Sequence, residues 1–181
     1  MACRLEPLSA ALHATRARLL FDLAREGGVE AADVLAAFGR ALALDRHDWF
    51  ARADAARAAA ALGELAEGER LVEAGLSDHP GLGLLLTERA ALELARGQLD
   101  RAERSARDAL KARWFGDRER PDRASLLLGV VLLERGQAGE AMGQAEALLR
   151  RRDWEPARQL LARCQARLSA PAPLADPRRP R

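Results

Sequence analysis

The sequence contains no tyrosine and no isoleucine, and only 4% of its 181 residues are aromatic. Alanine and leucine supply most of the apolar residues, which make up 49% of the chain, and β-branched residues are few. Alanine and leucine favour helices, whereas strands are usually rich in β-branched and aromatic side chains. The composition therefore predicts an all-α fold with a buried core, and it excludes an all-β protein or a doubly wound sheet.

Cysteine is scarce as well. Cys3 and Cys164 lie near opposite ends of the chain, with no CxxC motif and no Cys/His cluster. A disulfide framework and a zinc site both need more than these residues, so we expect free thiols in a reducing compartment. No basic segment followed by an apolar run opens the chain, and the leucine-rich runs are far shorter than a membrane helix needs. These absences predict a soluble, cytoplasmic protein without membrane insertion.

Lysine is almost absent. Lys111 is the only lysine, and arginine supplies the other positively charged side chains. The formal charge of +2 comes from the segment 170–181, where three arginines stand against one aspartate, and the rest of the chain is close to neutral. Proteins that bind nucleic acid usually have a basic surface, so we expect no nucleic-acid partner. Arginine in place of lysine, together with abundant alanine, is typical of the codon bias of a GC-rich bacterium.

Catalytic motifs are also absent. His13, His47 and His79 stand at the boundaries of predicted segments without the spacing of metal ligands. The chain has no nucleophile elbow, no phosphate-binding loop and no dinucleotide fingerprint in a strand-to-helix context. Only seven serine and threonine residues are available as hydroxyl nucleophiles. The sequence thus predicts a non-enzymatic protein with no catalytic residues, no metal site and no cofactor.

What the chain does contain is a repeat. Gly63 and Gly97 are 34 positions apart, Gly136 lies 39 positions further on, and an earlier copy contains Gly27 and Gly28. An apolar-periodic segment precedes each of these glycines and another follows it. A glycine just past a helix end can adopt the positive φ that other residues avoid. Each copy is therefore predicted to be a helical hairpin around a glycine turn.

The second segments of the copies share a residue pattern. It is seen in Phe38-x2-Ala41-Leu42, in Gly68-x3-Val72-x2-Gly75-Leu76-x3-Pro80 and in Ala102-x3-Ala106-x2-Ala109-Leu110. A 34-residue helical hairpin with this pattern resembles the tetratricopeptide repeat. The resemblance covers roughly residues 10–168. The first segments have mostly leucine or alanine where the family has tryptophan and tyrosine, and only Pro80 matches the closing proline.

The expected fold is an α-solenoid of about four such hairpins with a C-terminal capping helix. We place the repeats at about 8–47, 48–80, 81–112 and 122–152 and the capping helix at 153–169, so that one superhelical domain spans 1–169. Leu160, Leu161, Cys164 and Leu168 form the apolar side of the capping helix. The Pro/Arg-rich segment 170–181 is expected to be a flexible tail.

The resemblance also implies a binding surface. In tetratricopeptide proteins the first helices line the concave side of a curved stack, which implies a groove for a peptide or helix of a partner. Carried over to this chain, the residues expected to line it are Arg18, Asp22, Phe50, Asp54, Arg57, Leu84, Thr87, Glu88, Arg123, Leu126, Leu127 and Val130. The apolar members of this set fit equally well in the core between helices, because the register is uncertain by a residue or two.

A second candidate surface is the insertion 114–121 between the third and fourth repeats. Trp114 and Phe115 within it either cover the adjacent helix ends or contact a partner, since neighbouring aromatics with arginines are typical of binding hot spots. The sequence leaves both interpretations open.

Together these observations predict a non-enzymatic adaptor or chaperone, a scaffold that binds a peptide or helix of another protein. Two alternatives stay open. The chain is a structural subunit of a larger bacterial assembly of the secretion or motility type, within a complex or an oligomer, or it is a regulatory module with a small-molecule pocket.

Overall fold

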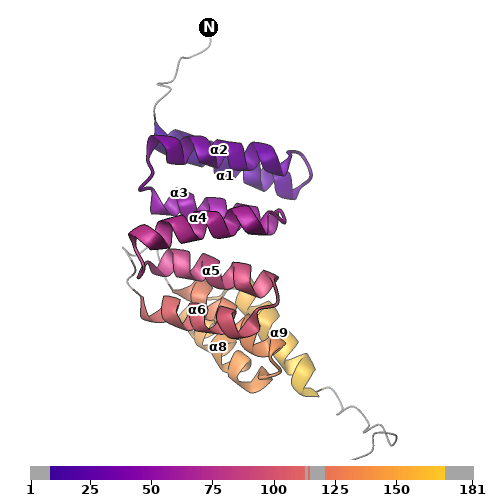
Figure 1. Cartoon of the computed structure of the whole chain (residues 1–181). Coiled ribbons are helices and arrows are strands. Elements are labelled where there is room, and N and C mark those ends of the chain that lie inside the picture. The colour runs from indigo at the N-terminus through magenta and orange to yellow at the C-terminus, as the bar shows by residue number, and fades with distance from the viewer. Residues whose placement is uncertain (1–8, 113, 115–120, 170–181) are drawn as a thin grey trace, which may run out of the picture.

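The computed structural model describes residues 9–112, 114 and 121–169, which form nine α-helices and no strand (Figure 1). Eight of the helices pair into four hairpins and the ninth follows alone. The pairs are α1 (Ala10–Arg25) with α2 (Ala31–Leu44), α3 (Trp49–Ala61) with α4 (Leu65–Asp78), α5 (Gly83–Ala95) with α6 (Leu99–Lys111), and α7 (Asp122–Glu134) with α8 (Ala138–Arg151); α9 spans Glu155–Ser169.

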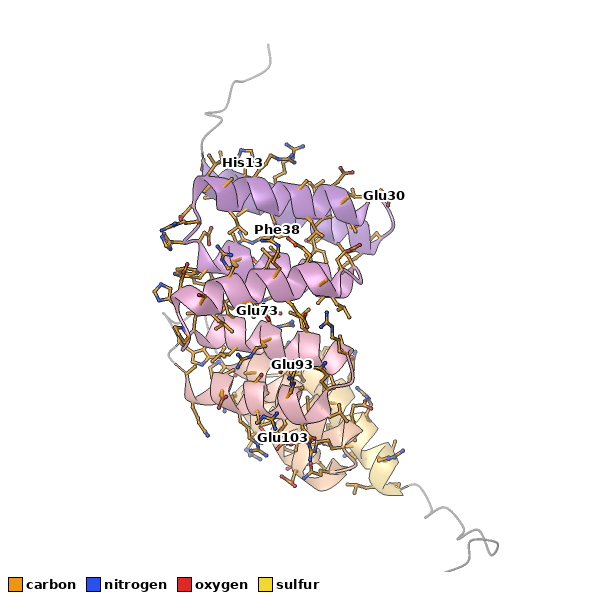
Figure 2. All side chains as sticks on the ribbon, viewed as in Figure 1. His13, Glu30, Phe38, Glu73, Glu93 and Glu103 are labelled. Carbon is orange, nitrogen blue, oxygen red and sulfur yellow. The ribbon has the colours of Figure 1, made fainter. Side chains whose placement is uncertain are left out.

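The hairpins stack in chain order, with α1 and α2 at one end and α9 near the other (Figure 1). The second helix of each hairpin packs against the first helix of the next, and the first helices also contact one another. Phe38 of α2, only 1% exposed, lies between the first two hairpins (Figure 2). The expectation of an all-α solenoid of helical hairpins is therefore confirmed.

Four bends of the same kind separate the helices of the hairpins. Gly27, Gly63, Gly97 and Gly136 have φ of 83°, 86°, 71° and 82°, and they are the only described residues with positive φ. In each bend the N–H after the glycine donates back to a carbonyl five residues earlier, at 2.8 to 3.0 Å. This is the hydrogen bond of a Schellman motif, which satisfies a carbonyl at the helix end. The sequence prediction of equivalent glycine turns is confirmed.

Helix α9 covers the last hairpin. Ala157, Leu160 and Cys164 are at most 2% exposed and face α7 and α8. The approach is close, because a Cβ on Gly129 of α7 would lie 2.6 Å from Leu160 Cδ2. Leu168 differs from the expectation and is 54% exposed. Arg163 already pairs with the last residue of α7 at 2.8 Å, so the final turn of α9 extends beyond the apolar surface that would cover Leu168.

Replacing Gly97 by alanine is expected to lower the free energy of unfolding by about 1–2 kcal/mol, because an L-residue adopts a left-handed φ only at that cost. Gly39, inside α2 and with no neighbouring atom within 4 Å of where a Cβ would lie, provides the matched control. Gly39→Ala should raise the unfolding free energy by about 0.5–1 kcal/mol, since alanine is the better helix former. Urea unfolding followed by circular dichroism measures both values. An unchanged stability of Gly97→Ala would contradict the positive φ at this bend.

The Cys164 thiol provides a test of the docking of α9. Burial raises the pKa of this thiol above its ordinary value, so the folded state favours the neutral, unreactive form. In a Cys3→Ser variant, Ellman's reagent should therefore react on the order of 100-fold more slowly with native protein than with urea-unfolded protein. By the same linkage, stability should fall as the pH rises past about 9, where an unfolded thiol ionises. Rapid reaction of the native protein would show that α9 is not docked.

Candidate functional site

One side of α1, α3, α5 and α7 carries most of the residues that the sequence assigns to a binding surface. Apart from the adjacent Leu126 and Leu127, neighbouring members of the set on each helix are three or four positions apart, so they lie on one side of it. We call this surface the first-helix face. It consists of Arg18 and Asp22 of α1, Phe50, Asp54 and Arg57 of α3, Leu84 and Glu88 of α5, and Arg123, Leu126, Leu127 and Val130 of α7.

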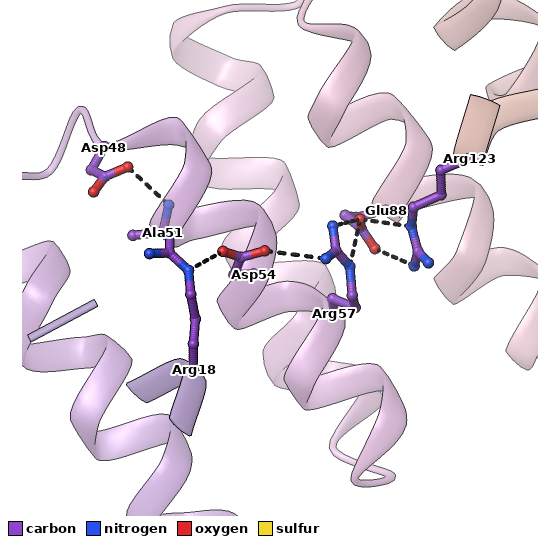
Figure 3. Close-up of polar contacts among 7 residues, drawn as sticks. All are labelled: Arg18, Asp48, Ala51, Asp54, Arg57, Glu88 and Arg123. Atoms are coloured by element: carbon purple, nitrogen blue, oxygen red, sulfur yellow. Dashed lines mark hydrogen bonds and ion pairs between the residues drawn. The ribbon is translucent and has the colours of Figure 1, made fainter. Parts of the chain in front are cut away.

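Five charged residues of the first-helix face form one chain of ion pairs that joins all four hairpins (Figure 3). Arg18 Nε donates to Asp54 Oδ2 at 2.6 Å, and Asp54 Oδ1 lies 3.2 Å from Arg57 Nη1. Arg57 Nη2 donates to Glu88 Oε1 at 2.9 Å, and Arg123 Nη2 donates to Glu88 Oε2 at 3.0 Å. The partners come from different hairpins in every pair except Asp54 with Arg57.

Glu88 is the buried member of the chain, with a side chain only 1% exposed. A buried carboxylate is costly unless it is paired and hydrogen-bonded. Arg57 and Arg123 meet that need with four N–H donors in total. Burial disfavours the charged form of Arg57, but attraction and hydrogen bonding to Glu88 outweigh it and leave the pKa of Arg57 raised. Each of the three arginines in the chain is therefore already paired with an internal carboxylate, and the three arginines share two carboxylates.

Apolar side chains border the ion pairs. Phe50 lies one helical turn before Asp54 and is 47% exposed. Leu126, Leu127 and Val130 pack with one side against the core cluster around Leu128 and remain partly exposed on the other. Leu84 is half-buried as well. The two interpretations that the sequence left open, core and surface, thus both apply to these side chains.

Two predicted residues of this region lie differently. Thr87 is 1% exposed, and its Oγ1 donates to Gly83 O within α5 at 2.7 Å, so its hydroxyl is not presented to solvent. Asp22 is exposed, but it lies outside the ion-pair chain, although it stands one turn after Arg18.

Trp114 lies against the third hairpin. Its Nε1 donates to Ala109 O at 2.9 Å, and a Cβ on Gly83 would lie 2.7 Å from its Cε2 atom. The indole thus covers the start of α5 beside the end of α6. This agrees with the interpretation in which Trp114 covers the adjacent helix ends. Phe115, the other predicted residue of this insertion, lies outside the described residues.

Sequence reasoning missed a partly enclosed cleft of about 260 Å³ between α2, α3 and α4. Phe38, Leu42 and Leu71 form part of its wall, and Arg52 contributes a buried Nε without a hydrogen-bond partner. No motif marks this cleft, because its lining residues come from three helices and only the stacking brings them together.

The described part of the chain offers neither a metal site nor a membrane-spanning helix. No cluster of three or more His, Cys, Asp or Glu side chains there is arranged to hold a metal ion. None of its helices combines the length and the apolar character that crossing a membrane requires.

A solved structure shows which known fold this is. The chain is similar to the crystal structure of a thermophilic TPR protein from Thermus thermophilus, with a TM-score of 0.70 and 19% sequence identity over 87% of this chain and 83% of that one. No protein-family model and no curated protein matches the chain. A likeness at this identity shows the fold, so the resemblance to the tetratricopeptide repeat is confirmed at that level.

Replacing Glu88 by glutamine tests the ion-pair chain. The variant keeps the shape of the side chain but leaves Arg123 without a counter-charge and Arg57 with Asp54 alone, and we expect a loss of about 1–3 kcal/mol in the free energy of unfolding. Glu67→Gln is the control, since Glu67 pairs with the exposed Arg70 on α4 alone and its loss should cost less than about 1 kcal/mol. Equal effects of the two substitutions in urea unfolding would show that Glu88 is not the centre of a structural network.

Proposed function

Because the chain has the fold of a tetratricopeptide repeat protein, we propose that it is a protein-interaction module whose first-helix face binds a peptide or a helix of another protein. In this proposal the face corresponds to the concave side that the resemblance implies. The chain acts as an adaptor or chaperone in the cytoplasm and contributes no catalytic residues, and its partner is a protein rather than a nucleic acid.

The observation that carries the proposal is the exposure of Phe50 beside a chain of ion pairs that needs no further partner. Phe50 is held on the rigid helix α3, and its exposed fraction of 47% makes a large aromatic surface available. Aromatic side chains fixed in this way dominate the energetics of many protein interfaces.

The first-helix face also supports a particular kind of occupant. Its α1 and α3 portion carries Arg18, Asp54 and Arg57, which are paired with one another, whereas its α7 portion carries Leu126, Leu127 and Val130. An amphipathic segment with polar side chains over Arg18, Asp54 and Arg57 and apolar ones over Phe50 and along α7 would match this division. The segment need not be acidic, because the arginines already have carboxylate partners.

The alternative of a structural subunit in a larger bacterial assembly uses the same face in a permanent contact. The two roles differ in the lifetime of the complex, since an adaptor or chaperone must release its partner.

To test this proposal, peptides that bind the purified chain are first selected from a displayed random library. We expect Phe50→Ser to weaken their binding by at least about tenfold, because a hot-spot aromatic contributes more than about 1.4 kcal/mol. Leu44→Ser removes an apolar side chain of similar exposure, 41%, from α2 and should leave the affinity unchanged. Fluorescence anisotropy measures both affinities, and urea unfolding checks that the variants are folded. Peptides that bind both variants equally well would place the binding surface elsewhere.

A further inference from the structure

The outer side of α1 carries three exposed leucines. Leu12, Leu19 and Leu23 have exposed fractions of 52%, 61% and 49%. Their spacing of seven and four residues places them in one line along the helix, opposite the buried Ala14 and Ala17. Side chains of α1 project at the end of the stack where Figure 2 labels His13. We call this line the leucine stripe.

The corresponding positions are buried in two inner hairpins. We compare residues that lie the same number of positions before the turn glycine of their hairpin. In α3 and α7 the residues that correspond to Leu19 and Leu23 are at most 2% exposed; they are Ala55, Ala59, Leu128 and Leu132. The second helix of the preceding hairpin contributes to their cover, as Phe38 of α2 does in the cluster that contains Ala55. In α5 the half-buried Arg89 and Glu93 take these positions. The leucine stripe is therefore a stacking surface that no described residue covers.

The opposite end of the stack is closed differently. Helix α9 covers α7 and α8 and turns a polar side outward, which includes Arg158, Gln159 and Arg163. Helical-repeat proteins need such polar caps to stay dispersed in water. The contrast between the two ends indicates that the leucine stripe is covered by another helix.

We propose that two copies of this chain pair through the leucine stripe, with the two α1 helices antiparallel about a twofold axis. An axis midway between residues 17 and 18 places Leu12 opposite the partner's Leu23. It places Leu19 level with the partner's Arg16, and therefore about 4.5 Å along the helix axis from the partner's Leu19. The stripe is thus complementary to itself in this arrangement, which a closed twofold contact requires. Both polar α9 caps then lie at the outer ends of the dimer, and no apolar end is left to recruit a third copy.

The charges along α1 fit the antiparallel direction. The first turn of α1 has no acidic residue, although its free N–H groups favour one. In the antiparallel pair, Glu26 at the end of one helix lies beside the first turn of the other and supplies that charge. Arg16 lies near the axis and close to the partner's Arg16.

The contact is small, because a 16-residue helix is only about 24 Å long. Interfaces of this size are typical of weak complexes. In sedimentation equilibrium we therefore expect the mass to rise with concentration from the monomer value of 19.7 kDa towards twice that value. Leu19→Glu should keep the protein monomeric across the same range, whereas Leu44→Glu, on the exposed side of α2, should still dimerise.

Cysteine cross-linking tests the direction of pairing in a Cys3→Ser background. On mild oxidation, a mixture of Leu12→Cys and Leu23→Cys chains should cross-link to each other in preference to themselves, because these two positions lie opposite one another in the antiparallel pair. Leu44→Cys serves as the control and should stay monomeric. Disulfides between like chains in the mixture would show parallel pairing and overturn the proposal.

Two outcomes of the sedimentation experiment would also overturn the proposal. If wild-type protein stays monomeric up to about 0.5 mM, the leucine stripe binds a helix of another protein and not a second copy of this chain. A Leu19→Glu variant that still dimerises would place the interface elsewhere. This inference does not depend on the proposed function, since Phe50→Ser should leave dimerisation intact.

Discussion

Stacking of one hairpin on the next is the interaction on which the rest of this structure depends. A pair of short helices joined by a glycine bend buries only part of its apolar surface, and a neighbouring hairpin has to cover the remainder. Phe38 and Leu128 are 1% and 2% exposed because each lies within such a junction. The same requirement aligns the first helices side by side, and this alignment creates the first-helix face.

The ion-pair chain follows from that alignment. Arg57, Glu88 and Arg123 belong to three different hairpins, and their charged groups meet only because the hairpins stack in a fixed register. Pairing makes the buried carboxylate of Glu88 tolerable and gives each arginine of the chain a carboxylate partner. Phe50 and the leucines of α7 then become the features that distinguish this surface, which is why the proposed partner is recognised mainly through apolar contacts.

A stack of repeats also has two ends, and here they differ. The C-terminal end is closed by α9, whose Leu160 packs directly over Gly129. At the other end Leu19 occupies a position that is buried in α3 and α7, yet it is 61% exposed. The first-helix face and the leucine stripe are separate sides of α1, so binding of a partner and pairing of two copies can occur on one molecule.

The sequence by itself determined the local structure. The spacing of apolar residues defines the helices, and glycine is the residue that takes the positive φ at Gly63 and Gly97, so hairpins, bends and the all-α solenoid could be predicted. It also identified the residues of the first-helix face. Only the tertiary structure decided how they pair, that Thr87 is buried within α5, and that Leu19 is exposed. Such properties depend on the rotation and separation of helices about 30 residues apart in the chain, and the packing of whole hairpins sets them.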